Sequence, residues 1–193
     1  MNQSKKVSRQ SQKIEIRLSG SGGQGLILAG VILAEAAAIY EGKNAIQTQS
    51  YGPEARGGAS KSEVIISDDE ILYPKTTRLD FLLALNQEAC DKYSHDLKDK
   101  GLLLVDSDAV DHLPPVRVTS LPLVRTAREK VGKTMTTNIV SLGALVGLSG
   151  VVSRKALEKA VLARVPKGTE KLNLLALKLG YELAEEIKER IED

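Results

Sequence analysis

The chain has 193 residues, of which 42% are hydrophobic, 27% charged and only 3% aromatic. Its 27 basic and 25 acidic residues leave a formal net charge of +2. With no Trp and one Phe, the sequence lacks the basic excess and the aromatic stacking platforms typical of nucleic-acid binders. No uninterrupted apolar run approaches the roughly 20 residues that cross a bilayer. We therefore expect neither a nucleic-acid partner nor a membrane.

The cysteine content narrows the class further, because Cys90 is the single thiol. One thiol excludes a disulfide scaffold, a four-cysteine zinc site and an iron–sulfur cluster held by four thiolates of this chain. A lone cysteine in a chain of this length is typical of a reducing compartment, so we expect a cytoplasmic protein. Residues 1–13 are polar and lack the apolar segment of a secretory signal. They are predicted to be a flexible N-terminal tail, followed by a single domain at 14–193.

The first half of that domain alternates strand and helix patterns. A short alternating strand at 14–18 leads into a glycine-rich loop and then into a helix at 26–40 that is apolar nearly all round, as a buried helix is. Further strands are expected at 44–49 and 62–67, and nearly continuous apolar runs at 79–86 and 101–107 suit strands covered on both faces. The polar stretch at 87–98 is predicted to be helical.

The last third is helical. After a short strand at 116–119 between prolines, helices are expected at 138–148, 153–165 and 169–191. Strands that alternate with helices indicate an α/β fold. We predict three layers, with a mainly parallel sheet flanked by helices and a C-terminal helical segment.

The loop after the first strand carries the clearest site signal. Gly20, Gly22 and Gly25 fit the pattern G-x-G-x-x-G between a strand and a helix, where backbone amides and the helix dipole favour an anion. The alternative is that the glycines only allow the strand and the helix to pack closely. A dinucleotide site needs an acidic residue about 20 positions later, and residues 47–50 are Gln, Thr, Gln and Ser. No Lys-Ser or Lys-Thr completes a P-loop either.

Two more polar features are candidates. Arg56 lies in a loop between a proline and two glycines, where a guanidinium could bind a carboxylate or phosphate or could simply be solvated. Asn138 begins an apolar helix and is most simply its N-cap, with contact to a ligand as the alternative. Asp106 and Asp108 follow an apolar strand and are explained equally well by a turn or by a carboxylate pair. Cys90 is expected to be inert. The sequence shows no complete catalytic apparatus, so we assign no catalytic or metal-binding residue.

These motifs together resemble a known family. GSGGQG at 20–25, SYGPEARGG at 50–58, SKSEVIIS at 60–67 and TTNIVSLGAL around Asn138 are similar to the gamma subunit of the 2-oxoacid:ferredoxin oxidoreductases. The resemblance covers the chain from about residue 14 to the C-terminal helix. The sequence YGPEARGG resembles that of the 2-oxoglutarate members more than that of the pyruvate members.

The resemblance implies a multisubunit enzyme that oxidatively decarboxylates a 2-oxoacid with coenzyme A to an acyl-CoA, CO2 and reduced ferredoxin. Thiamine diphosphate with Mg2+ and the iron–sulfur clusters would belong to alpha, beta and, in some complexes, delta subunits, and this chain alone would bind no cofactor. The single cysteine and the lack of a thiamine diphosphate motif agree with that division. Its own part would be assembly and the coenzyme A side of the active site. The residues expected there are Gly20, Gly22, Gly23, Gln24, Gly25, Arg56 and Asn138.

Two alternatives stay open at this point. The chain could be the gamma subunit of an enzyme specific for pyruvate or for branched-chain 2-oxoacids, or it could be a free-standing nucleotide- or CoA-binding module. A complete dehydrogenase would require the acidic ribose ligand that residues 47–50 lack.

Overall fold

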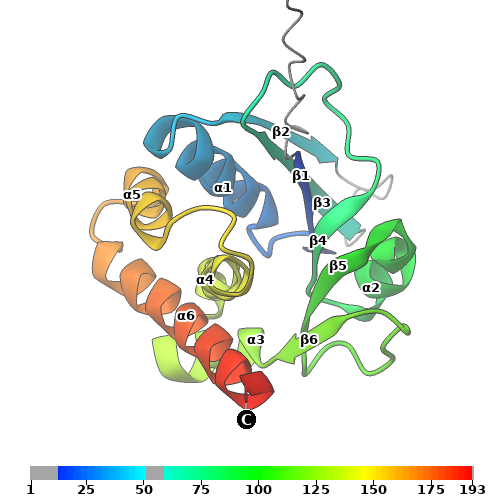
Figure 1. Cartoon of the computed structure of the whole chain (residues 1–193). Coiled ribbons are helices and arrows are strands. Elements are labelled where there is room, and N and C mark those ends of the chain that lie inside the picture. Colours follow the sequence, from blue (N-terminus) through cyan, green and yellow to red (C-terminus); the bar gives the residue numbers. More distant parts are fainter. Residues whose placement is uncertain (1–12, 51–58, 193) are drawn as a thin grey trace, which may run out of the picture.

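The computed structural model describes residues 13–50 and 59–192, which form one sheet with helices on both faces (Figure 1). The six strands have the order β2-β3-β1-β4-β5-β6. Their bounds are β1 Ile14–Ser21, β2 Asn44–Ser50, β3 Ala59–Ser67, β4 Leu79–Ala84, β5 Leu97–Asp106 and β6 Val118–Leu121. The pairs β1–β4, β4–β5 and β5–β6 are parallel, whereas β3 runs antiparallel to both of its neighbours. The mainly parallel α/β fold is confirmed.

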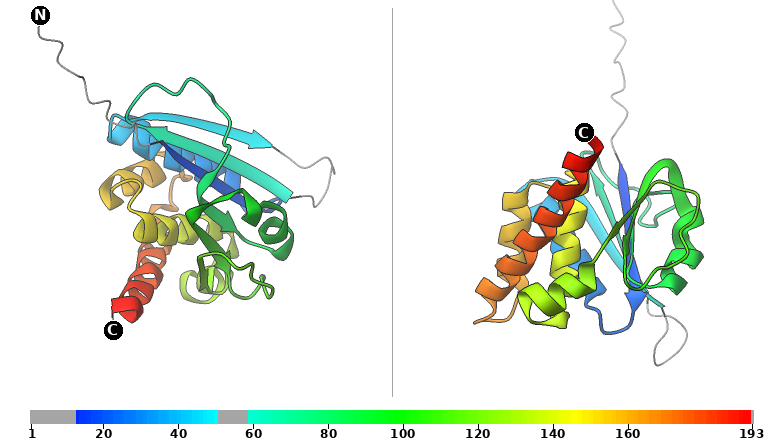
Figure 2. Two further views of the ribbon diagram at one scale, coloured as in Figure 1. Left: turned by 45° about the vertical axis from the view of Figure 1, so that its right-hand side comes forward. Right: turned by 90° about the horizontal axis from the view of Figure 1, so that it is seen from below.

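The helices divide unequally between the two faces. Figure 2 shows one crowded helical layer and, across the sheet, a thin layer built around α2. The helices are α1 Leu26–Tyr40, α2 Gln87–Tyr93, α3 Leu123–Thr126, α4 Thr137–Ser149, α5 Arg154–Arg164 and α6 Glu170–Glu192. Short helical turns follow α2 at Ser94–Asp96 and α3 at Ala127–Val131, and another precedes α4 at Thr134–Thr136. In the described part of the chain, no helix is both long and apolar enough to cross a bilayer.

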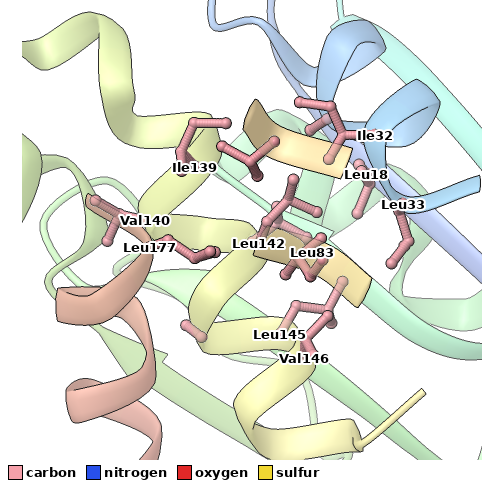
Figure 3. Packing of buried hydrophobic residues seen from close by; sticks show 14 of the residues in the cluster. Leu18, Ile32, Leu33, Leu83, Ile139, Val140, Leu142, Leu145, Val146 and Leu177 are labelled. Atoms are coloured by element: carbon pink, nitrogen blue, oxygen red, sulfur yellow. The ribbon is translucent and has the colours of Figure 1, made fainter. Parts of the chain in front are cut away.

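The core explains the two layers. Ile16 and Leu18 of β1 and Leu83 of β4 point into the larger cluster, where they meet side chains of α1, α4 and α6 (Figure 3). Leu82 of β4 points the other way, into a smaller cluster with Cys90 of α2. Successive side chains of a strand point to opposite faces, so a continuous apolar run serves both layers at once.

Several boundaries differ from the sequence predictions. β5 begins at Leu97, four residues earlier than expected, and its pairing with β4 shifts in register between Leu79 and Phe81. The helix predicted at 87–98 accordingly ends earlier, at Tyr93, before the Ser94–Asp96 turn. The residues of β5 at this register shift, 98–100, are polar, so the sequence shows no apolar alternation there.

Candidate functional site

The glycine loop connects the end of β1 to the start of α1. Gly23 and Gly25 have φ angles of +88° and +71°, the left-handed region that favours glycine. Gly25 is the N-cap of α1, and no side chain in the described residues caps this helix. The first turn of α1 also carries no acidic residue. Its amide groups and the positive end of its dipole are therefore available to an anion.

Packing accounts for two of the loop's glycines. A Cβ atom at Gly20 would lie 2.3 Å from Oε1 of Gln24, and that oxygen accepts a hydrogen bond from the Ser21 amide at 2.7 Å. A Cβ atom at Gly25 would lie 2.6 Å from Nδ2 of Asn138, which donates to the Gly25 carbonyl at 3.2 Å. These two positions have no room for a larger residue, so the packing interpretation is sufficient for them.

Gly22 is different. A Cβ atom there would meet no atom of the described residues within 4 Å, and its φ angle lies outside the left-handed region. Gly23 also faces open space, although its positive φ angle is a reason of its own for glycine. Neither backbone conformation nor packing against the described residues requires a glycine at Gly22, so its backbone is open to contact from outside that part of the chain.

Two pockets lie beside this loop and share one wall. The smaller, of about 160 Å³, is lined by Gly23 and Gln24 together with Val124, Thr134, Met135 and Thr137. The larger, of about 320 Å³, is mostly apolar. It is lined by Leu28, Lys133, Met135, Thr136, Asn138, Ile139, Val165, Pro166, Thr169, Leu172 and Asn173. Met135 borders both pockets and is 89% exposed. The arrangement suits a ligand with an anionic group at the loop and a long arm in the apolar pocket.

The sequence predicted Asn138 as the N-cap of its helix, and this prediction was wrong. α4 has Thr136 as its N-cap, and Asn138 is its second residue and is buried. The helical turn before α4 makes the chain helical before Asn138 is reached. In this turn the Thr136 hydroxyl donates to the carbonyl of Lys133 at 2.8 Å. The Asn138 side chain is thereby free to hold the glycine loop. Its contact with Gly25 joins segments 113 residues apart, which sequence reasoning could not have found.

Arg56, the last predicted site residue, lies outside the described residues. Ala59, where the described chain resumes, pairs with Ser21 at the end of β1.

The sequence analysis missed several pocket-lining residues, which are Leu28 of α1, Val165, Pro166 and Thr169 between α5 and α6, and Leu172 and Asn173 of α6. They are ordinary apolar and polar residues, and no motif marks them. Those at 165–173 are far from the glycine loop in sequence and line the pocket together with residues of α4, along which α6 packs.

Cys90 and Asp106, two titratable residues considered in the sequence analysis, have structural explanations. Burial, together with the nearby Asp91 charge, raises the pKa of the Cys90 thiol, which makes it a poor nucleophile. Asp106 is buried, and its carboxylate accepts hydrogen bonds from the amides of Val124 at 2.7 Å and Asp108 at 3.1 Å. It therefore closes the turn after β5, and burial raises its pKa despite those bonds. Within the described ranges, no three His, Cys, Asp or Glu side chains gather as metal ligands would.

Comparison with known families decides the relationship. The family model described as pyruvate ferredoxin/flavodoxin oxidoreductase matches residues 15–183. The chain belongs to this family. Among members of the oxidoreductase family, 2-oxoglutarate synthase subunit KorC of Methanocaldococcus jannaschii is 56% identical over 183 residues, covering 93% of this chain and 98% of the relative. The KorC subunit of Methanothermobacter marburgensis is 50% identical over 177 residues, covering 88% and 95%.

A solved member of the same oxidoreductase family has the same fold. The keto/oxoacid ferredoxin oxidoreductase gamma subunit from Geobacter sulfurreducens is 59% identical and superimposes with a TM-score of 0.85. The alignment covers 91% of this chain and 98% of that one. The chain is thus similar over nearly its whole length to single subunits of such oxidoreductases.

Proposed function

We propose that the chain is the gamma subunit of a 2-oxoglutarate:ferredoxin oxidoreductase and that, within the complex, it helps to bind coenzyme A. The 2-oxoglutarate assignment follows the KorC relatives, which match this chain over nearly all of their length. Oxidative decarboxylation would take place on thiamine diphosphate, with Mg2+ and iron–sulfur clusters, in alpha, beta or delta subunits. Ferredoxin would accept the electrons from the complex. We place the complex in the cytoplasm, where a free cysteine stays reduced.

The environment of Gly22 is the observation that supports coenzyme A binding. Among the described residues its backbone faces open space at a helix N-terminus with no side-chain cap, and neither packing nor conformation there requires a glycine. Coenzyme A combines phosphate groups with a long flexible arm, and its thiol accepts the acyl group. We assign its anionic groups to the amides around Gly22, Gly23 and Gln24. The apolar pocket between Leu28 and Leu172 would take part of the arm, with Lys133 at its wall.

A matched pair of variants tests this assignment. Gly22→Asp adds a carboxylate where we place an anion, whereas Gly22→Asn adds a side chain of nearly the same size without charge. In the reconstituted complex we expect Gly22→Asp to raise the KM for coenzyme A roughly tenfold more than Gly22→Asn, at similar kcat. Equal KM values for both variants and the wild type would remove coenzyme A from the glycine loop.

The subunit assignment has its own test. Activity of the complex is measured with several 2-oxoacids, coenzyme A and ferredoxin, with this chain omitted in one arm. We expect omission to abolish or strongly lower turnover and 2-oxoglutarate to be the preferred substrate. Preference for pyruvate or a branched-chain 2-oxoacid would reassign the substrate. Unchanged turnover without the chain, and failure to co-elute with the other subunits in gel filtration, would favour a free-standing binding module.

Arg56 is assigned to the edge of the same site, facing substrate or a neighbouring subunit. The pairing of Ala59 with Ser21 supports this, because Ala59 follows Arg56 by three residues and lies beside the last residue of β1. We expect Arg56→Ala to raise the coenzyme A requirement or to weaken assembly. A variant complex with wild-type stability and kinetics would remove Arg56 from the site.

A further inference from the structure

The segment between β3 and β4, residues 68–78, projects from the molecule. Figure 1 and the left view of Figure 2 show it arching away from the sheet before the chain returns to β4. It has no helix or strand of its own. What fixes such a segment is its hydrogen bonds, and these come from both of its ends.

Two carboxylates of the sheet hold its C-terminal end. The buried side chain of Glu15 on β1 accepts hydrogen bonds from the amides of Thr77 and Arg78, the latter at 3.1 Å. Glu63 on β3 accepts a hydrogen bond from the hydroxyl of Thr76. Glu63 is in turn fixed by Arg17, whose guanidinium is buried and pairs with it at 2.6 Å.

The N-terminal end is tied to the edge of the sheet. The side-chain amide of Asn44 donates to the carbonyl of Asp68 at 3.3 Å, and the amide of Asp69 donates to the hydroxyl of Ser67 at 3.1 Å. Holding both ends in this way lowers the entropy that the loop has left to lose when another molecule binds its tip.

The tip carries apolar side chains that face water. Leu72 is 86% exposed and Tyr73 is 55% exposed, and Pro74 follows them. Large exposed apolar and aromatic side chains on a rigid support are the anchors that protein interfaces use. Three exposed acidic residues precede the tip, and no cation in the described residues forms an ion pair with any of them. They are Asp68, Asp69 and Glu70.

We infer that this tip docks into another subunit of the oxidoreductase, in an apolar pocket rimmed by lysine or arginine side chains. Charge complementarity selects the partner, because the three acidic residues before the tip outnumber the exposed Lys75 after it, and together they favour a basic surface and repel an acidic one. A second copy of this chain is disfavoured, since two tips meeting about a twofold axis would bring their acidic residues together. The inference rests on the proposed role as a subunit.

The experiment measures binding of the chain to the remaining subunits of the complex. The double variant Leu72→Ser/Tyr73→Ser is expected to raise the Kd roughly 30-fold or more, as loss of interface anchors does. Neutralising the acidic residues with Asp68→Asn/Asp69→Asn/Glu70→Gln is expected to slow association and to flatten its dependence on salt. Leu113→Ser, which changes a leucine of 50% exposure elsewhere, is the matched control and should leave the Kd unchanged.

The outcomes separate this inference from the proposed function. If the wild-type chain does not bind the other subunits, the proposed function fails. If it binds and the tip variants bind equally well, or the control is equally damaging, the docking inference fails alone. A tip variant that assembles normally but raises the KM for ferredoxin overturns the docking inference too, because it assigns the tip to the electron acceptor. The variants are expected to unfold at the same temperature as the wild type, because the changed positions are exposed. Such a result excludes a folding defect.

Discussion

The side-chain amide of Asn138 links α4 to the glycine loop, and a single-atom change tests that link. In Asn138→Asp a carboxylate oxygen would face the Gly25 carbonyl in place of the donor now 3.2 Å away. We expect a loss of about 1–3 kcal/mol in the free energy of unfolding, because a partly buried carbonyl loses one of its donors and faces a charge. Denaturant unfolding measures the change. Asn138→Ala should be milder, because it removes one donor without placing a charge against the Gly25 carbonyl, which in both variants still accepts from the Ala29 amide at 3.0 Å.

Tyr181 on α6 is a residue whose polar atom contributes nothing visible to the fold. Its hydroxyl is buried without a hydrogen-bond partner in the described chain, and burial raises its pKa to about 12. The ring packs under the Arg154 guanidinium at 4.5 Å. We therefore expect Tyr181→Phe to unfold at the same temperature as the wild type or higher, with a gain of up to about 1 kcal/mol. A loss larger than that in thermal unfolding would show that the hydroxyl has a partner.

Helices α4 and α6 cross closely at Gly143 and Gly180. A Cβ atom at Gly180 would lie 2.1 Å from the Val140 carbonyl oxygen and 2.9 Å from the Cα of Gly143. Both neighbours are backbone and cannot move aside easily, so we expect Gly180→Ala to destabilise by about 1–3 kcal/mol. Alanine is the better helix former by about 1 kcal/mol, so propensity alone predicts the opposite sign. Urea unfolding distinguishes the two, with the exposed Lys178→Ala on the same helix as control.

The elements that the sequence predicted well are those whose signal is local. The helix expected at 26–40 has those bounds in α1, because its apolar residues are continuous and Gly25 marks its start. The helical turns after Pro122 were not predicted, since segments of three to five residues are too short to show a period. Strand order and the antiparallel direction of β3 depend on contacts between distant segments. The same limit applies to the candidate site. Gly22 belongs to a motif that can be recognised in the sequence, whereas the residues of the apolar pocket come from distant segments that no motif marks.

The charge distribution of the whole molecule predicts how its stability responds to acid. Burial opposes ionisation of Glu63 and Glu15, but hydrogen bonds and ion pairs outweigh it and lower the pKa of both below 4.5. Their contribution to stability is therefore complete above pH 4.5 and is lost as the pH falls further. Asp106 acts in the opposite sense, because burial raises its pKa above 3.8 and acid relieves the cost of its buried charge.

Denaturant unfolding between pH 7 and pH 3.5 tests this balance. We expect the wild type to keep a nearly constant free energy of unfolding down to about pH 4.5 and to lose stability below it, as the amides of Thr77 and Arg78 lose their charged acceptor Glu15. Glu63→Gln should be about 1–3 kcal/mol less stable at pH 7, because Arg17 loses its charged partner, and should lose less on acidification. Asp106→Asn should lose more than the wild type over the same range. If Glu63→Gln and the wild type fall with the same slope, the ion pair with Arg17 does not hold the pKa of Glu63 down.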